Sequence, residues 1–198
     1  VHINDYEFLQ EMYQEDTQHH EQHRFKPSVY GGFDVLDFSV LDLALQEVEA
    51  RACHYMSFPK KLLLLEFARD NYQRALRQFQ PAFLQDSYFL FFEASLDMCI
   101  RRVYERSSNP TSWNDHFISE QMIRSYYSQD NQPYLTYNLL ADYGISDKRV
   151  RVINNTGSRK EFNAQLESFV QTFLDREHDG GEFTEFQPGR GEKETYHA

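Results

Sequence analysis

Two acidic residues stand directly behind short apolar runs. Asp5 follows residues 1–4, and Glu66 closes the leucine run of residues 62–65. If these runs are buried parallel strands, a carboxylate at the carboxyl end of each faces the crevice where open α/β sheets bind ligands. Glu66 also has an ordinary structural interpretation, because Arg69 follows closely enough to form an ion pair with it. Both interpretations of Glu66 stand at this point.

A pair of arginines has the spacing of one helix face. Arg102 and Arg106 are four residues apart, so their side chains project from the same side of a predicted helix. Guanidinium groups bind phosphates in a bidentate manner and stack on planar bases. Glu105 and Asp97 offer the alternative of ordinary surface ion pairs.

Histidines supply two weaker candidates. His19, His20 and His23 have a spacing that could converge on a metal ion, but no cysteine or clear fourth ligand accompanies them, so we interpret this stretch as a polar loop. Asp115 and His116 form an adjacent acid and base, which either exchange protons with a ligand or serve packing and helix capping.

The elements that must position these side chains alternate along the chain. Short apolar runs predict strands, and apolar residues at helical spacing predict amphipathic helices. A serine at residue 95 predicts a helix start, and Ser158 with Glu161 forms a capping box before the last helix. The strands are expected at 1–4, 62–66, 88–93 and 149–153, and the helices at 41–52, 70–84, 95–106, 119–127 and 158–174. This alternation predicts an α/β fold in which helices flank a parallel sheet.

Composition narrows the class of protein. The 198 residues predict one domain, over residues 1–177, and the polar residues 178–198 predict a flexible tail. A net charge of -11 argues against nucleic acid as a partner, and no apolar run approaches the length of about 20 residues that spans a membrane. Two cysteines without a disulfide framework suit a reducing compartment, so we expect a cytoplasmic protein.

Four segments, taken in order, resemble the P-loop kinases that act on nucleosides, nucleotides and other small molecules. They are residues 1–5, an apolar strand ending in an acid; residues 62–69, a second such strand; residues 88–116, a strand, a helix and an arginine-bearing lid; and residues 150–158, a last strand with its Asn-x-Gly-Ser turn. The resemblance covers about residues 1–174.

This resemblance implies ATP and Mg²⁺ as cofactors and a lid over about residues 107–130. It implies catalytic roles for Asp5 as base, for Glu66 as the acid that orients Mg²⁺, and for Arg102 and Arg106 as phosphate-binding cations. The residues implied for binding small molecules are Arg69, Asp34, Asp115 and His116 for the phosphate acceptor, and Asn155, Gly157 and Ser158 for the nucleotide.

One motif of the family is missing. None of the eight glycines begins or completes the phosphate loop G-x-x-x-x-G-K-[ST]. We therefore expect the first strand and its loop to precede Val1 in a longer parent protein, or to come from a partner chain that completes the sheet. The expected activity of the complete protein is ATP-dependent phosphorylation of a small hydroxyl compound.

Two other interpretations remain at this point. A kinase-like scaffold without catalysis could serve nucleotide sensing or protein contact, and the missing loop favours it if no loop is supplied from elsewhere. Alternatively the chain is another parallel α/β domain, in which residues 62–65 are merely core; a helical conformation there would favour this third interpretation.

Overall fold

Four short strands form two separate parallel pairs. The computed structural model describes residues 1–18, 23–28, 31–58, 62–112, 115–129 and 138–178. Strand β1 (His2–Asn4) pairs with β4 (Leu64–Glu66), and β5 (Phe89–Glu93) pairs with β6 (Val150–Asn154). Within the described residues no hydrogen-bonded ladder joins the two pairs. The expected four strands are all present, in two sheets of two.

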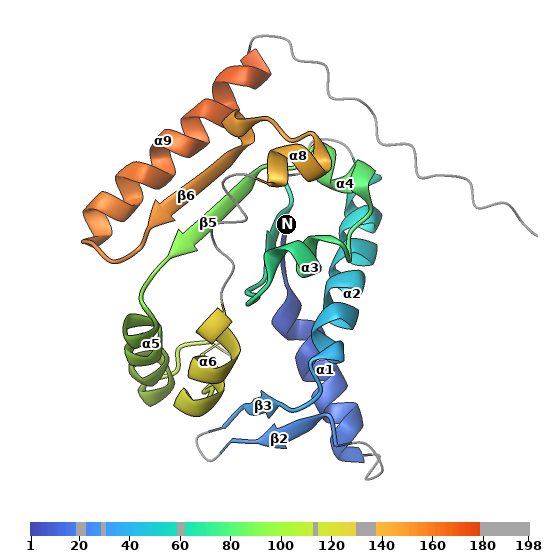
Figure 1. Cartoon of the computed structure of the whole chain (residues 1–198), viewed down its shortest axis with the longest axis vertical. Coiled ribbons are helices and arrows are strands. Elements are labelled where there is room, and N and C mark those ends of the chain that lie inside the picture. Colours follow the sequence, from blue (N-terminus) through green and yellow to red (C-terminus); the bar gives the residue numbers. More distant parts are fainter. Residues whose placement is uncertain (19–22, 29–30, 59–61, 113–114, 130–137, 179–198) are drawn as a thin grey trace, which may run out of the picture.

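Helices surround both pairs (Figure 1). Helix α1 follows β1 directly, α2 is the long helix packed on α1, and α9 runs along β6. The helices are α1 (Asp5–Gln18), α2 (Ser39–Met56), α3 (Tyr72–Leu76), α4 (Pro81–Gln85), α5 (Leu96–Ser108), α6 (Glu120–Tyr126), α8 (Leu139–Tyr143) and α9 (Arg159–His178), with 3₁₀ turns η1 (Tyr127–Gln129) and η2 (Asp147–Arg149). The coarse prediction of a mixed α/β fold with small parallel sheets flanked by helices is confirmed.

The core sits between α1, α2 and the strands. Helix α2 buries the apolar stripe that its sequence spacing predicts, comprising Leu41, Leu45, Val48 and Ala52. Ile3 of β1 is also fully enclosed. This stripe packs α2 against α1 and β1, and so fixes the position of Asp5 at the end of β1.

Two helices begin directly after serines whose hydroxyl groups cap them. The Ser95 hydroxyl accepts from the Met98 amide at the start of α5, as predicted. Ser158 and Glu161 form the predicted capping box: the Glu161 carboxylate accepts from the Ser158 amide at 2.8 Å, and the Ser158 hydroxyl accepts from the Glu161 amide at 3.3 Å. These caps place α5 and α9 immediately after β5 and β6.

Two elements differ from expectation. The helix expected in residues 70–84, with its end near Pro81, is shorter than predicted: α3 ends at Leu76. Pro81 then starts a new helix, α4, because proline cannot continue a helix but fits its first turn. A hairpin of β2 (Phe25–Pro27) and β3 (Phe33–Val35) was not predicted, since neither segment contains a continuous apolar run. The predictions for His19, His20 and residues 179–198 lie outside the described residues.

No helix among the described residues has the length and apolar character needed to cross a bilayer.

Candidate functional site

The carboxyl ends of the strands face one end of the molecule. Figure 1 shows the chain leaving β1 toward α1 and leaving β5 toward α5 in the same direction, with α6 and the β2–β3 hairpin gathered at that end. In parallel α/β sheets this is the end at which ligands bind. Most of the residues that the sequence singled out lie here, so this end is the candidate site.

Asp5 and Arg69 form a buried ion pair at this end. Arg69 Nη1 lies 2.6 Å from Asp5 Oδ2, and both side chains are less than a tenth exposed. Arg69 also donates to the Leu41 and Ala68 carbonyls, at 2.8 and 2.7 Å. Burial raises the pKa of the Asp5 carboxyl above its usual range, although the Arg69 charge opposes that shift. The pair joins the end of β1 to the segment after β4 and to α2.

Glu66 is the exposed acid of the site. Its carboxylate lies 2.9 Å from His2 Nε2 across the β1–β4 pair, and its side chain is 63% exposed. Within the described residues no group of three or more acidic, histidine or cysteine side chains is placed to hold a metal ion. Glu66 alone could be the protein ligand of a Mg²⁺ ion only if nucleotide phosphates and waters supplied the other oxygen ligands, as in nucleotide-binding sites.

Three contacts join residues 116–119, which lie in the segment expected to form a lid, to the hairpin and to α1. His116 stacks on Tyr6 with ring centroids 3.7 Å apart and planes 4° from parallel. Asp34 of β3 accepts from the Ser119 amide at 3.1 Å. Gly32, at φ +76°, approaches the Phe117 carbonyl so closely that a Cβ there would lie 2.9 Å from that oxygen. Asp34 therefore binds the backbone of Ser119, and His116 packs against Tyr6.

Asp115 organises the lid's own backbone. Its carboxylate accepts from the Thr111 amide at 2.7 Å, the Ser112 amide at 2.9 Å and the Thr111 hydroxyl at 3.0 Å. These bonds lower the pKa of Asp115 below its usual range. Asp115 and His116, neighbours in sequence, therefore engage separate partners.

A second group of residues meets between α5 and the turn after β6. Arg102 Nη2 donates to the Asn155 carbonyl at 2.8 Å. The two residues belong to a shallow cavity of about 380 Å³ whose lining joins three of the predicted residues to three that were not predicted. The lining residues are Arg102, Asn155, Gly157, Arg159, Phe162 and Asn163. Ser158 lies beside this cavity, with its hydroxyl and amide committed to the capping box.

Arg106 connects the two groups through one helix. It projects from α5 one turn after Arg102, and it is exposed. Burial raises the pKa of Tyr6, and the positive charge of Arg106 opposes that shift. Of the two arginines predicted on one helix face, Arg102 lines the cavity and Arg106 is exposed one turn later.

Three tyrosines near Asp5 were not predicted as site residues. Tyr6 carries the stack with His116, and burial strongly raises the pKa of Tyr126 and Tyr127. The charges of Arg69 and Asp5 act on Tyr127, which places it near the buried ion pair. The sequence favoured core or lid packing for Tyr126 and Tyr127, and it gave no signal for Tyr6.

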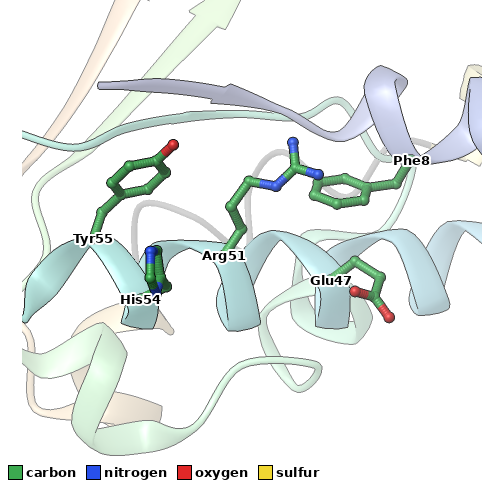
Figure 2. Close-up of a pocket in the computed structure, with 5 residues that line it drawn as sticks. All are labelled: Phe8, Glu47, Arg51, His54 and Tyr55. Carbon is green, nitrogen blue, oxygen red and sulfur yellow. The ribbon is translucent and has the colours of Figure 1, made fainter.

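A larger cavity of about 490 Å³ lies along α2 (Figure 2). It contains none of the predicted residues, and Figure 2 shows Arg51 reaching from α2 toward Phe8 of α1. The Arg51 guanidinium lies 4.3 Å from the Phe8 ring centroid and bonds the Glu7 carboxylate at 2.7 Å. These contacts hold α1 to α2, and we assign the cavity no chemistry.

No family model matches the chain, and neither a curated protein nor a solved structure matches it.

Proposed function

We propose that this chain carries the nucleotide-base, acceptor and lid parts of an ATP-dependent phosphotransferase that acts on a nucleoside, a nucleotide or another small hydroxyl compound. Mg²⁺ accompanies the nucleotide, with Glu66 as its one protein ligand from this chain. The phosphate loop comes from outside residues 1–198.

The observation that carries the proposal is the Arg102–Asn155 contact. It joins α5, the helix after β5, to the turn after the neighbouring strand β6, although the two residues are 53 positions apart in sequence. The bond thus borders a shallow cavity beside the carboxyl ends of these strands. Arg102 and Arg159 supply positive charge there, and Phe162 supplies an aromatic face. A guanidinium has five N–H donors, so Arg102 can bond the Asn155 carbonyl and a nucleotide together.

The acceptor side is supported by the residues around Asp5. The lid reaches this region through His116 on Tyr6 and through the Ser119 amide on Asp34. A lid anchored in this way excludes water when it closes over an acceptor, which phosphoryl transfer requires to avoid hydrolysis. Arg106, exposed on α5 one turn after Arg102, supplies a further positive charge for the transferring phosphate.

Calorimetric titration of the chain with Mg·ATP tests the nucleotide part of the proposal. Arg102→Ala should weaken binding by about tenfold to a hundredfold, since one charge-assisted hydrogen bond contributes about 1.5–3 kcal/mol. Arg101→Ala is the matched control, because Arg101 is the adjacent residue, is 65% exposed and faces Glu105. Arg159→Ala removes a second positive charge of the cavity and keeps the Arg102–Asn155 bond, so it separates loss of charge from local unfolding. Equal affinity of Arg102→Ala and Arg101→Ala would remove the support for this site.

One observation favours the alternative of nucleotide sensing without catalysis. Asp5, the expected base, is enclosed with Arg69 in the described structure and is not presented to an acceptor. A protein that binds Mg·ATP in the cavity but transfers no phosphate, even with a phosphate loop supplied, would fit this second function. Measuring ADP release in the presence of a nucleoside mixture distinguishes the two.

A further inference from the structure

His116 and Tyr6 stack almost face to face. Their ring centroids lie 3.7 Å apart and their planes are 4° from parallel, which leaves little room for an offset between the rings. Aromatic side chains prefer offset or edge-on pairs with centroids about 4.5–7 Å apart, because the negative faces of two fully overlapping rings repel each other. This stack is therefore not the arrangement that two side chains favour when they pack freely. It has the geometry of a flat ring laid on an aromatic face.

Tyr6 belongs to a row of stacked rings that joins α1 to the β2–β3 hairpin. The Tyr6 and Phe33 centroids lie 5.7 Å apart with planes at 12°, and the Phe33 and Tyr13 centroids lie 4.7 Å apart with planes at 27°. Tyr6 and Phe33 are buried. The fourth ring, that of half-buried His116, comes from residues 116–119. The face of Tyr6 is thus fixed by the core, and a separate segment covers it.

The segment that carries His116 has a core of its own. Phe117 is buried in a cluster formed with α5 and α6, whereas Tyr6 and Phe33 belong to the main cluster formed with α1 and α2. The bond from the Ser119 amide to Asp34 ties this segment to the hairpin independently of the stack. The His116 ring can therefore leave Tyr6 while both clusters remain packed.

Tyr6 directly follows Asp5, the expected base, at the end of β1. We propose that the phosphate acceptor is uncharged and carries a planar ring, as a nucleoside does, and that this ring takes the place of His116 on Tyr6. The inference rests on the acceptor side of the proposed phosphotransferase. Without an acceptor, the His116 imidazole occupies the position of the ligand ring, and so it competes with the acceptor for Tyr6.

The charges at this end of the molecule favour a nucleoside over a nucleotide as acceptor. Two arginines here already bind carboxylates: Arg69 Nη1 lies 2.6 Å from Asp5 Oδ2, and Arg124 Nη2 lies 2.7 Å from Asp97 Oδ1. The exposed Arg106 is assigned to the transferring phosphate. A phosphate on the acceptor would compete with these carboxylates for a guanidinium, whereas the hydroxyls and base of a nucleoside would leave the ion pairs intact.

NMR of the chain with labelled histidine rings tests the displacement of His116. The probe is a mixture of adenosine, guanosine, cytidine and thymidine. Mg·ATP is present throughout, to fill the cavity between α5 and the turn after β6. A ring stacked on tyrosine has its proton signals shifted upfield by the tyrosine ring current. The nucleosides should move the His116 signals back toward those of an unstacked ring and should leave the signals of His54, exposed on α2, unchanged.

Replacing His116 separates competition from ordinary binding. His116→Ala should strengthen nucleoside binding by about twofold to tenfold, the contribution of one aromatic stack, because it removes the competing ring. His116→Phe, which keeps a ring on Tyr6, should not strengthen it, and His54→Ala is the matched control. A nucleoside 5′-monophosphate should bind no more tightly than its nucleoside. Weaker binding to His116→Ala, tighter binding of the monophosphate, or bound nucleosides that leave the His116 signals unchanged would overturn the proposal.

The outcomes also separate this inference from the nucleotide part of the proposed function. If Mg·ATP does not bind but the nucleosides still displace His116, the nucleotide site is wrong and the stacking site on Tyr6 stands. If Mg·ATP binds and no nucleoside does, the stacking site is wrong and the nucleotide site stands.

Discussion

Arg69 and Asp5 meet at 2.6 Å in the interior, whereas Arg74 and Asp42 meet at the same distance with the arginine side chain 58% exposed. The two pairs differ mainly in burial. Removing one partner of a buried pair leaves an uncompensated charge out of water, while an exposed partner is simply solvated. The Asp5–Arg69 pair is therefore a structural support of the candidate site as well as part of it.

This contrast gives a stability prediction. Arg69→Met should lower the free energy of unfolding by about 3–5 kcal/mol, the range for breaking a buried ion pair. Arg74→Met should cost less than about 1 kcal/mol, as exposed pairs do. Urea denaturation measures both. The double replacement Asp5→Leu with Arg69→Met should recover part of the loss; equal costs for Arg69→Met and Arg74→Met would contradict the assigned burial.

Alanine at Gly31 and alanine at Gly32 should affect the contact between the hairpin and residues 115–126 differently. Gly31 and Gly32 both have positive φ, so alanine at either position pays a backbone cost of about 1–2 kcal/mol. A Cβ at Gly31 meets nothing within 4 Å, whereas one at Gly32 meets the Phe117 carbonyl at 2.9 Å. Gly32→Ala should therefore also speed hydrogen exchange over residues 115–126, and Gly31→Ala should not. Similar exchange in the two variants would show that the hairpin does not anchor the lid.

Much of this arrangement could be predicted from sequence. Residues 1–4, 62–66 and 88–93 contain β1, β4 and β5, and residues 149–153 contain all but the last residue of β6, because short apolar runs and β-branched residues favour strands. The partners of Asp5 and Asp34 could not be predicted, since they depend on which segments the fold brings together. Nothing near Asp34 in sequence signals the Ser119 amide, which lies 85 residues away.

The shared helix face of the two arginines could be predicted from sequence, whereas the partner of Arg102 could not. Helical spacing predicted that Arg102 and Arg106 share a face, which is a local property. The target of Arg102 is not local, because its guanidinium donates to the Asn155 carbonyl in the turn after β6. The capping box at Ser158 was predictable because both of its residues lie within one helical turn.

Asp115 should make lid stability depend on pH. Its pKa is lowered by the Thr111 and Ser112 bonds, so its stabilising contribution is full above the unfolded pKa of about 3.8 and is lost as pH falls through the lower folded value. Asp115→Asn should therefore destabilise the protein at pH 7, and its difference from the wild type should shrink in acid. Thermal unfolding across pH measures this, with Glu167→Gln on the exposed surface of α9 as control. A difference that stays constant to low pH would contradict the assignment.

The central claim is that a nucleotide binds between α5 and the turn after β6. Hydrogen exchange of the chain with and without saturating Mg·ATP tests it most directly, because it locates binding without presupposing catalysis. The account predicts slower exchange over residues 95–106 and 154–163, with little change along α2 beside Arg51 and Tyr55. Unchanged exchange throughout, or protection confined to α2, would contradict it.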